Sequence, residues 1–329
     1  MAKKPCLITI DIGGSKIAFG VLPIVENQVI PKLLFRSVAP SVRGKSALAS
    51  TLKDIVARAH LKAHSYLYEP IQTLFIGLPG RLTGPNNTII APGSAAQLWA
   101  HENEFDNVDI RELLQGSLGK YTLILKNDGL TQMAGGLLQL TESAAIAQSI
   151  KGKRIAYIGP GTGLGGGFCT FNSRSNMSFF TDGHIYDILL PSGDTRIRAE
   201  DLISSVAFKS FASETPREIN SSVALIAQYR PKILKMGNAL GQLIESIHLG
   251  NIEKTPPENA WPQNDINKVK GTEIFMLGGS IATKGEIARL LQMQIKAHLS
   301  AAHLAPIRCL PIPDVDQAAL IGAAPFVTI

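Results

Sequence analysis

The first segment with residues that could do chemistry is Asp11-Ile12-Gly13-Gly14-Ser15-Lys16. Its two glycines let backbone N–H groups approach a phosphate, Ser15 can donate a further hydrogen bond, and Asp11 can hold Mg²⁺ through water. Lys16 is a weaker phosphate ligand, because it begins the outgoing strand. An ordinary Gly-Gly hairpin has the same appearance. The segment therefore indicates a phosphate site but requires a second signal.

The second segment is Gly161-Thr162-Gly163-Leu164-Gly165-Gly166-Gly167, which contains more glycine than a turn requires. Each glycine costs conformational entropy on folding, and close approach of the backbone to an anion would justify that cost. A dinucleotide fingerprint is the alternative, but its glycines open a helix, whereas residues 168–171 are typical of a strand. The pattern favours a second phosphate loop.

A carboxylate and an amide, Asn127-Asp128, follow the apolar residues 121–125. The carboxyl end of a strand is where α/β proteins place their ligands. Asp128 is therefore a candidate general base that accepts the proton of an attacking hydroxyl in phosphoryl transfer. The alternative is that Asp128 only caps a helix beginning at Leu130.

Three further positions carry weaker signals. His184 and Glu200 flank a loop and could hydrogen-bond a polyol, although a lone histidine is more often structural. Gly278-Gly279 follows the strand-like residues 273–277 and suits a flat ring lying against backbone. A plain turn between strand and helix explains this glycine pair nearly as well.

The elements that position these residues form a repeat. A strand, a glycine turn and a second strand are predicted over residues 6–22, and again over residues 154–171. This repeat predicts two related α/β halves. We expect an N-terminal domain of residues 1–126, completed by residues 315–329, and a larger domain of residues 127–314. Other predicted elements are helices over 45–66, 200–211 and 222–249, a loop over 251–270 and a βαβ unit over 273–310.

Composition excludes several classes of protein. The 329 residues are 45% hydrophobic and 18% charged, as in ordinary globular domains. Lysine and arginine are scattered apart from Lys151, Lys153 and Arg154, so we expect no nucleic-acid partner despite the net charge of +6. The three cysteines are far apart, which favours a reducing compartment, the cytoplasm. No apolar run approaches the roughly 20 residues of a membrane helix.

Six segments together resemble the ROK (repressor, open reading frame, kinase) group of sugar kinases. They are DIGGSK at 11–16, GLPG at 77–80, Asn127-Asp128, PGTGLGGG at 160–167, LGGS at 277–280 and DVDQAALIGAA at 314–324. The resemblance implies a two-domain actin-like ATPase (ribonuclease H-like) fold with a central cleft, and a homodimer. It also implies transfer of the γ-phosphoryl of Mg-ATP to the 6-hydroxyl of a hexose or N-acetylhexosamine.

The same resemblance assigns roles to residues. Asp128 would be the catalytic base, and Asn127, Gly80, His184 and Glu200 would bind the sugar. The nucleotide ligands would be Asp11, Gly13, Gly14, Ser15, Lys16, Gly161, Thr162, Gly163, Gly278 and Gly279, with Asp11 also facing Mg²⁺ through water.

The chain departs from the ROK pattern in two places. ROK proteins usually carry a cysteine-rich zinc motif between the sugar-binding His and Glu, and residues 189–198 contain no cysteine, so we expect no zinc site. Thr181 stands where the family has a sugar-contacting Glu. These departures leave open a catalytically weak sugar-binding regulator, or another phosphotransferase or ATPase of the superfamily. Only about ten residues precede Asp11, which disfavours a DNA-binding repressor.

Overall fold

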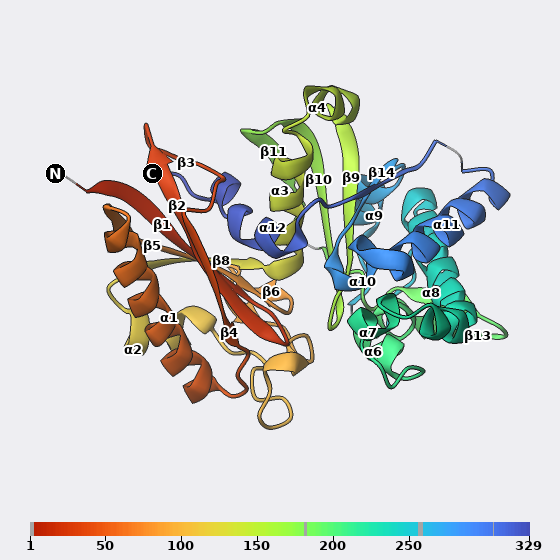
Figure 1. Cartoon of the computed structure of the whole chain (residues 1–329), viewed down its shortest axis with the longest axis horizontal. Coiled ribbons are helices and arrows are strands. Elements are labelled where there is room, and N and C mark those ends of the chain that lie inside the picture. Colours follow the sequence, from red (N-terminus) through yellow and green to blue (C-terminus); the bar gives the residue numbers. More distant parts are fainter. Residues whose placement is uncertain (1–2, 181–182, 256–258, 305) are drawn as a thin grey trace. The chain divides into compact units, whose positions relative to one another are not determined.

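The computed structural model describes residues 3–180, 183–255, 259–304 and 306–329, and the chain divides into two compact units (Figure 1). The first contains Met1–Gln139 and Asp316–Ile329, and the second contains Leu140–Val315. The predicted boundary after residue 126 is too early. Helix α3 (Asp128–Leu140) belongs almost entirely to the first unit, because it packs tightly against the C-terminal helix α12 (Val315–Ile321).

The first unit is built on a sheet with the strand order β3-β2-β1-β5-β8, in which β4 also pairs with β2. Strands β1 and β2 are antiparallel, whereas β5 runs parallel to both β1 and β8. In Figure 1, α1 and α2 lie on one side of this sheet, and α3 and α12 lie on the other. The remaining bounds are β1 (Lys4–Ile12), β2 (Lys16–Val25), β3 (Gln28–Val29), β4 (Phe35–Pro40), α1 (Lys45–Ser65), β5 (Tyr68–Leu78), β6 (Leu82–Thr83), β7 (Ile89–Ile90), α2 (Ile110–Leu118) and β8 (Thr122–Asn127).

The second unit has a sheet with the order β11-β10-β9-β14-β15 and a separate hairpin of β12 and β13. Helices α8 and α11 pack side by side. The bounds are α4 (Ala144–Ile150), β9 (Lys153–Pro160), β10 (Leu164–Ser173), β11 (Asn176–Phe179), β12 (Leu189–Ser192), β13 (Thr195–Arg198), α5 (Ala199–Ile203), α6 (Ser205–Lys209), α7 (Pro216–Asn220), α8 (Val223–Leu249), α9 (Gln263–Val269), β14 (Ile274–Leu277), α10 (Gly279–Thr283), α11 (Gly285–Ala301) and β15 (Arg308–Pro311). No described helix combines the length and apolar character that a transmembrane segment needs.

The two sheets repeat one arrangement. In the first, β2-β1-β5-β8 consists of an antiparallel hairpin followed by two parallel pairings. In the second, β10-β9-β14-β15 has the same order and the same strand directions. The predicted repeat and the predicted βαβ unit, β14-α11-β15, are therefore confirmed. Each unit also has its own buried core, as two α/β halves require.

Two predicted elements are wrong. The helix expected over residues 200–211 is broken at Ser204, whose backbone is extended and whose side chain accepts from Ala207 N to start α6. The loop expected over 251–270 contains α9, and three of its described residues, Lys254, Trp261 and Val269, are buried. Polar composition correctly indicated irregular backbone but not its burial.

Close contact between α3 and α12 gives a first prediction. A Cβ on Gly135 would lie 1.8 Å from the Ala318 carbonyl oxygen, whereas a Cβ on Gly116, in the interior of α2, would meet nothing within 4 Å. We expect Gly135→Ala to destabilise the protein by about 1–3 kcal/mol through overpacking. Gly116→Ala, as the matched control, should stabilise it by about 0.5–1 kcal/mol. Urea denaturation of both variants measures the difference, and equal effects would contradict the close helix contact.

Candidate active site

In the first unit, the turn between β1 and β2 carries the first glycine segment. Gly13 N donates to Lys16 O over 2.9 Å and closes the turn, and Ser41 Oγ donates to Gly13 O over 2.8 Å. Ser15 is exposed at the tip of the turn. The segment is therefore a braced hairpin whose tip is open to a ligand. Ser41, which braces it, carries no signal in its own sequence surroundings.

Lys16 does not extend freely from this turn. Its Nζ donates to Asp316 Oδ1 over 2.7 Å, and Arg36 lies 3.6 Å from the same oxygen. The Lys16 and Asp316 side chains are 47% and 36% exposed, so water screens the pair and a phosphate could displace the carboxylate. The structure thus assigns Lys16 a partner in the C-terminal segment that its position at the start of β2 does not indicate.

Asn127 and Asp128 lie where β8 ends and α3 begins. Asn127 Nδ2 donates to Gly80 O over 2.9 Å, and Asn127 Oδ1 accepts from Leu130 N over 3.3 Å. Asp128 Oδ1 accepts from Gly129 N over 2.8 Å. The helix therefore begins at Asp128 rather than at Leu130, and the side chain that accepts from Leu130 N belongs to Asn127. The alternative in which Asp128 only caps the helix is not what the structure shows.

The backbone oxygen of Gly80 accepts the hydrogen bond from Asn127 Nδ2. Its φ is +95°, a conformation that favours glycine, and an added Cβ would lie 3.0 Å from both Ala95 Cβ and Ser94 O. The predicted Gly80 and Asn127 therefore meet at one edge of the first sheet, joined by a hydrogen bond.

Two carboxylates, Asp11 and Asp128, also meet in the first unit. Burial, and after it the charge of Asp128, raises the pKa of Asp11 to about 8, and Lys16 only partly opposes the rise. Asp11 Oδ1 is out of solvent and has no hydrogen-bond partner among the described residues. Two close carboxylates with an orphaned buried oxygen fit a divalent cation, which would let both ionise at neutral pH. Asp11, which carries the orphaned oxygen, is therefore a residue of this unit that suits Mg²⁺.

In the second unit, the turn between β9 and β10 carries the other glycine segment. Gly161 N donates to Gly163 O over 2.8 Å. Ser205 N donates to Gly161 O over 2.7 Å, and Ser205 Oγ contacts Thr162 O at 3.5 Å. A serine from a distant segment thus braces this loop, as Ser41 braces the first.

Gly278 and Gly279 lie beside the same loop. A Cβ on Gly278 would come within 2.3 Å of the Tyr157 ring, and one on Gly279, whose φ is +71°, would lie 2.0 Å from Pro160 O. Side chains are excluded at both positions by backbone and ring contacts. The structure therefore brings Gly278 and Gly279 to the start of the turn that carries Gly161, Thr162 and Gly163.

Glu200, on α5, is attached to this loop by a hydrogen bond. Its Oε1 accepts from Leu164 N over 3.2 Å and lies 2.4 Å from where a Gly163 Cβ would be. Burial raises the pKa of Glu200 above its ordinary value. A side chain at position 163 would therefore require the Glu200 carboxylate to move away from the loop.

His184 is buried in a charged network that the sequence did not indicate. Its backbone oxygen accepts from Lys254 Nζ over 3.0 Å, and Lys254 pairs with Asp187 Oδ1 at 3.1 Å. The His184 ring packs edge-on against Tyr186. Polar composition around residue 254 gives no sign that this lysine is almost fully buried. Thr181, the other departure noted above, lies outside the described residues.

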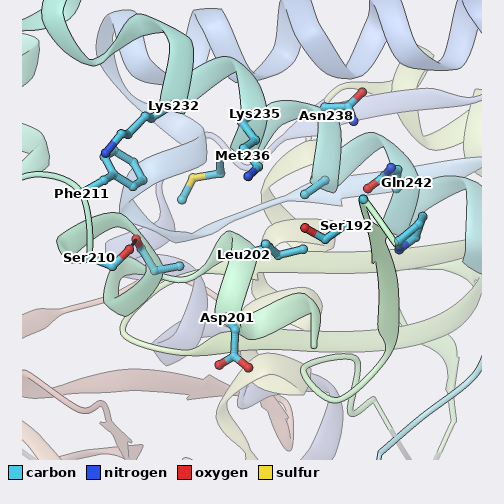
Figure 2. Close-up of a pocket in the computed structure, with 14 residues that line it drawn as sticks. Ser192, Asp201, Leu202, Ser210, Phe211, Lys232, Lys235, Met236, Asn238 and Gln242 are labelled. Carbon is cyan, nitrogen blue, oxygen red and sulfur yellow. Dashed lines mark hydrogen bonds between the residues drawn. The ribbon is translucent and has the colours of Figure 1, made fainter. Parts of the chain in front are cut away.

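A pocket of about 490 Å³ also lies in the second unit, and none of the predicted site residues lines it (Figure 2). Leu202 from α5 and Met236 from α8 form part of its wall. The Lys232 ammonium lies 5.4 Å from the centre of the Phe211 ring. This pocket adjoins α5, the helix that carries Glu200, but it is distinct from the glycine loop.

No protein-family model matches the chain, and no curated protein sequence does either. Solved structures do match over almost the whole chain. A ROK-family glucokinase from Streptomyces griseus, in complex with glucose and AMPPNP, is 17% identical with a TM-score of 0.60, covering 98% of this chain and 99% of that one. A ROK hexokinase from Thermus thermophilus is 18% identical with a TM-score of 0.59, covering 97% of each chain.

A transcriptional regulator has the same fold. A ROK-family regulator, homologous to the E. coli MLC protein, is 13% identical with a TM-score of 0.66, covering 98% of this chain and 79% of that one. Identities this low speak to architecture and not to activity. From the strand order of both units and these structural matches, the chain has the actin-like ATPase fold that ROK sugar kinases share.

Proposed function

We propose that this protein is a ROK-family kinase that transfers the γ-phosphoryl group of ATP to the 6-hydroxyl of a hexose or an N-acetylhexosamine. The observation that carries the proposal is the group at one edge of the first sheet. There Asp128 begins α3, Asn127 is bonded to Gly80, and a second carboxylate, Asp11, lies close to Asp128. Phosphoryl transfer to a sugar alcohol requires a base, an amide that binds a sugar hydroxyl, and a position for a cation.

In this proposal Asp128 accepts the proton of the attacking hydroxyl, and Asn127 orients the sugar. Asp11 would hold Mg²⁺ through water, and the bound ion would neutralise charge on the phosphates, which leaves Asp128 unbound to metal as the base. The N–H groups of Gly13 and Gly161 close their own turns, so the backbone N–H groups of Gly14, Thr162 and Gly163 contact the phosphates. The side chains of Ser15, Lys16 and Thr162 help to bind them. Gly278 and Gly279 provide a flat backbone surface for the adenosine, and His184 and Glu200 bind the ring.

The solved glucokinase bound to glucose and AMPPNP supports the pairing of a sugar with ATP. We further propose that the protein works as a cytoplasmic homodimer. In support of the cytoplasm, Cys6 and Cys169 are buried as free thiols, and Cys309 is also free. Sedimentation velocity tests the dimer.

A coupled assay of ADP release tests the function. Purified protein with Mg-ATP is offered glucose, mannose, fructose, N-acetylglucosamine and N-acetylmannosamine in turn. The proposal predicts sugar-dependent ADP release with at least one of these sugars, and a 6-phosphate product by NMR. ADP release that does not depend on sugar would indicate an ATPase instead.

A sugar-binding regulator is the second candidate, favoured by the match to the ROK regulator. It predicts that one of the same sugars binds, measured by calorimetry, while no ADP is released. Binding with turnover would exclude it.

Glu200 gives a prediction within the kinase proposal. Glu200→Gln keeps an oxygen that can accept from Leu164 N but removes the charge that would bind a sugar hydroxyl. We expect the sugar KM to rise by about tenfold or more, the equivalent of one charged hydrogen bond. Glu142→Gln, an exposed position in the same unit, is the control and should leave KM unchanged. An unaltered sugar KM in Glu200→Gln would remove Glu200 from the site.

A further inference from the structure

Three side chains with metal-ligand chemistry converge at the junction of α1 and β5. His60 and His64 lie four residues apart in the last turns of α1, and Glu69 is the second residue of β5. One ligand atom from each lies within 4.8 Å of the others. None of the three belongs to the phosphate or sugar residues described above.

Local geometry explains the convergence. Residues four apart lie on the same face of a helix, so the two imidazoles are neighbours, with ring centres 5.9 Å apart. The chain then reverses through Leu67, whose φ of +63° is uncommon for a residue with a side chain. Lys4 N donates to Leu67 O over 3.1 Å and attaches this turn to β1. The reversal brings Glu69 back to His64.

The contacts within the cluster suit a cation. His64 Nε2 lies 3.0 Å from Glu69 Oε2, is out of solvent, and has no other partner among the described residues. His60 Nε2 lies 2.5 Å from the Tyr121 hydroxyl. When His60 Nε2 donates to the Tyr121 hydroxyl oxygen, His60 Nδ1 carries the lone pair that can bind a metal. A hydrogen-bond partner outside the set of metal ligands commonly orients a metal-binding imidazole in this way.

Some of the charges around the cluster favour the binding of a cation, and others oppose it. Burial, followed by the charges of Lys120 and His64, lowers the pKa of His60, and the charge of Glu69 opposes this effect. The C-terminal end of α1 carries partial negative charge, which also favours a cation. Against these, Lys3 Nζ already contacts Glu69 Oε2 at 2.9 Å. A divalent ion must therefore displace Lys3 from the carboxylate.

We propose that His60, His64 and Glu69 form a binding site for a divalent transition-metal cation of the Zn²⁺ type. Two imidazoles and one carboxylate are a ligand set that zinc accepts, with water in the fourth position. Ligand atoms around tetrahedral zinc are about 3.4 Å apart, given bonds of about 2.0–2.2 Å, so small side-chain rotations close the present spacing.

The position of the site points to a stabilising role. Glu69 pairs with Pro5 at the start of β1, whereas Asp11 lies near its end. Six residues of strand separate these positions by about 20 Å. The metal would join the end of α1 to the start of β5 across the strained turn, far from Asp11 and Asp128. The proposal therefore stands independently of the kinase activity.

The test uses the full-length protein without a purification tag, stripped with chelator and titrated with Co²⁺ by visible absorption and with Zn²⁺ by calorimetry. With excess Mg²⁺ present to fill the cation position at Asp11, we expect one transition-metal ion per chain and a higher melting temperature with Zn²⁺. His60→Ala and His64→Ala should each lower the affinity for Zn²⁺ by about tenfold or more, because even changes to residues that only contact the metal ligands cost that much. Lys3→Met should raise it, because Glu69 loses its competing cation.

His101→Ala, an exposed histidine of the same unit, is the matched control and should bind metal as the parent does. Circular dichroism of each variant without metal establishes that it is folded. Saturable binding that survives the His60→Ala/His64→Ala double change would overturn the proposal, as would the absence of one-to-one binding in the parent.

Discussion

Asp128→Asn should lower kcat for sugar-dependent ADP release by about a hundredfold or more, the usual contribution of a positioned general base. Asparagine keeps the shape of aspartate and an oxygen that can accept from Gly129 N, as Asp128 Oδ1 does. It cannot accept a proton from the attacking hydroxyl. The loss should therefore appear in kcat, while the thermal stability of the variant stays close to that of the parent.

The control is Asp54→Asn, which makes the same chemical change on the exposed side of α1 in the same unit. Steady-state kinetics of both variants should be compared with ATP binding measured by calorimetry. If Asp128→Asn retains kcat within about threefold of the parent, Asp128 is not the base, because general-base loss exceeds that range.

Lys254→Met should destabilise the second unit by about 3–5 kcal/mol, the cost of leaving a buried charge without its partner. The side chains of Lys254 and Asp187 are 1% and 2% exposed. Lys254 also donates to His184 O, and its ammonium lies 4.6 Å from the centre of the Trp261 ring. Burial raises the pKa of Asp187, and the nearby ammonium opposes that rise. Removing Lys254 leaves the Asp187 carboxylate buried without its cationic partner.

The measurement is urea denaturation followed by tryptophan fluorescence. The chain has two tryptophans, Trp99 in the first unit and Trp261 in the second. A Trp99→Phe background therefore leaves Trp261 as the reporter of the second unit. The double change Lys254→Met/Asp187→Asn should recover part of the loss, because it removes both charges.

An exposed pair provides the control. Lys153 and Glu273 are 2.8 Å apart, with side chains 48% and 41% exposed. Lys153→Met should change the free energy of unfolding by no more than about 1 kcal/mol, since water screens such pairs. Equal losses in Lys254→Met and Lys153→Met would show that burial does not govern the strength of the first pair.

Much of the fold and part of the candidate site could be predicted because their causes are local. Gly13-Gly14 and Gly161–Gly163 lie in hairpin turns that neighbouring strand residues define, and Asn127-Asp128 lies at a strand end that the preceding apolar residues define. The repeat of two α/β halves follows from the same contiguous patterns. Helix α1 follows from apolar residues at helical spacing, and the structure places it at Lys45–Ser65.

Only the tertiary structure determined how distant residues meet. The pairing of Lys16 with Asp316, the approach of Asp11 to Asp128, and the serines that brace each glycine turn join segments far apart in the chain. The buried Lys254 and the His60, His64 and Glu69 cluster are of the same kind. A side chain's type is local information, but its burial and its partners depend on which surfaces pack together. Sequence patterns therefore identified the candidate chemistry, and packing decided which charges are buried and what they contact.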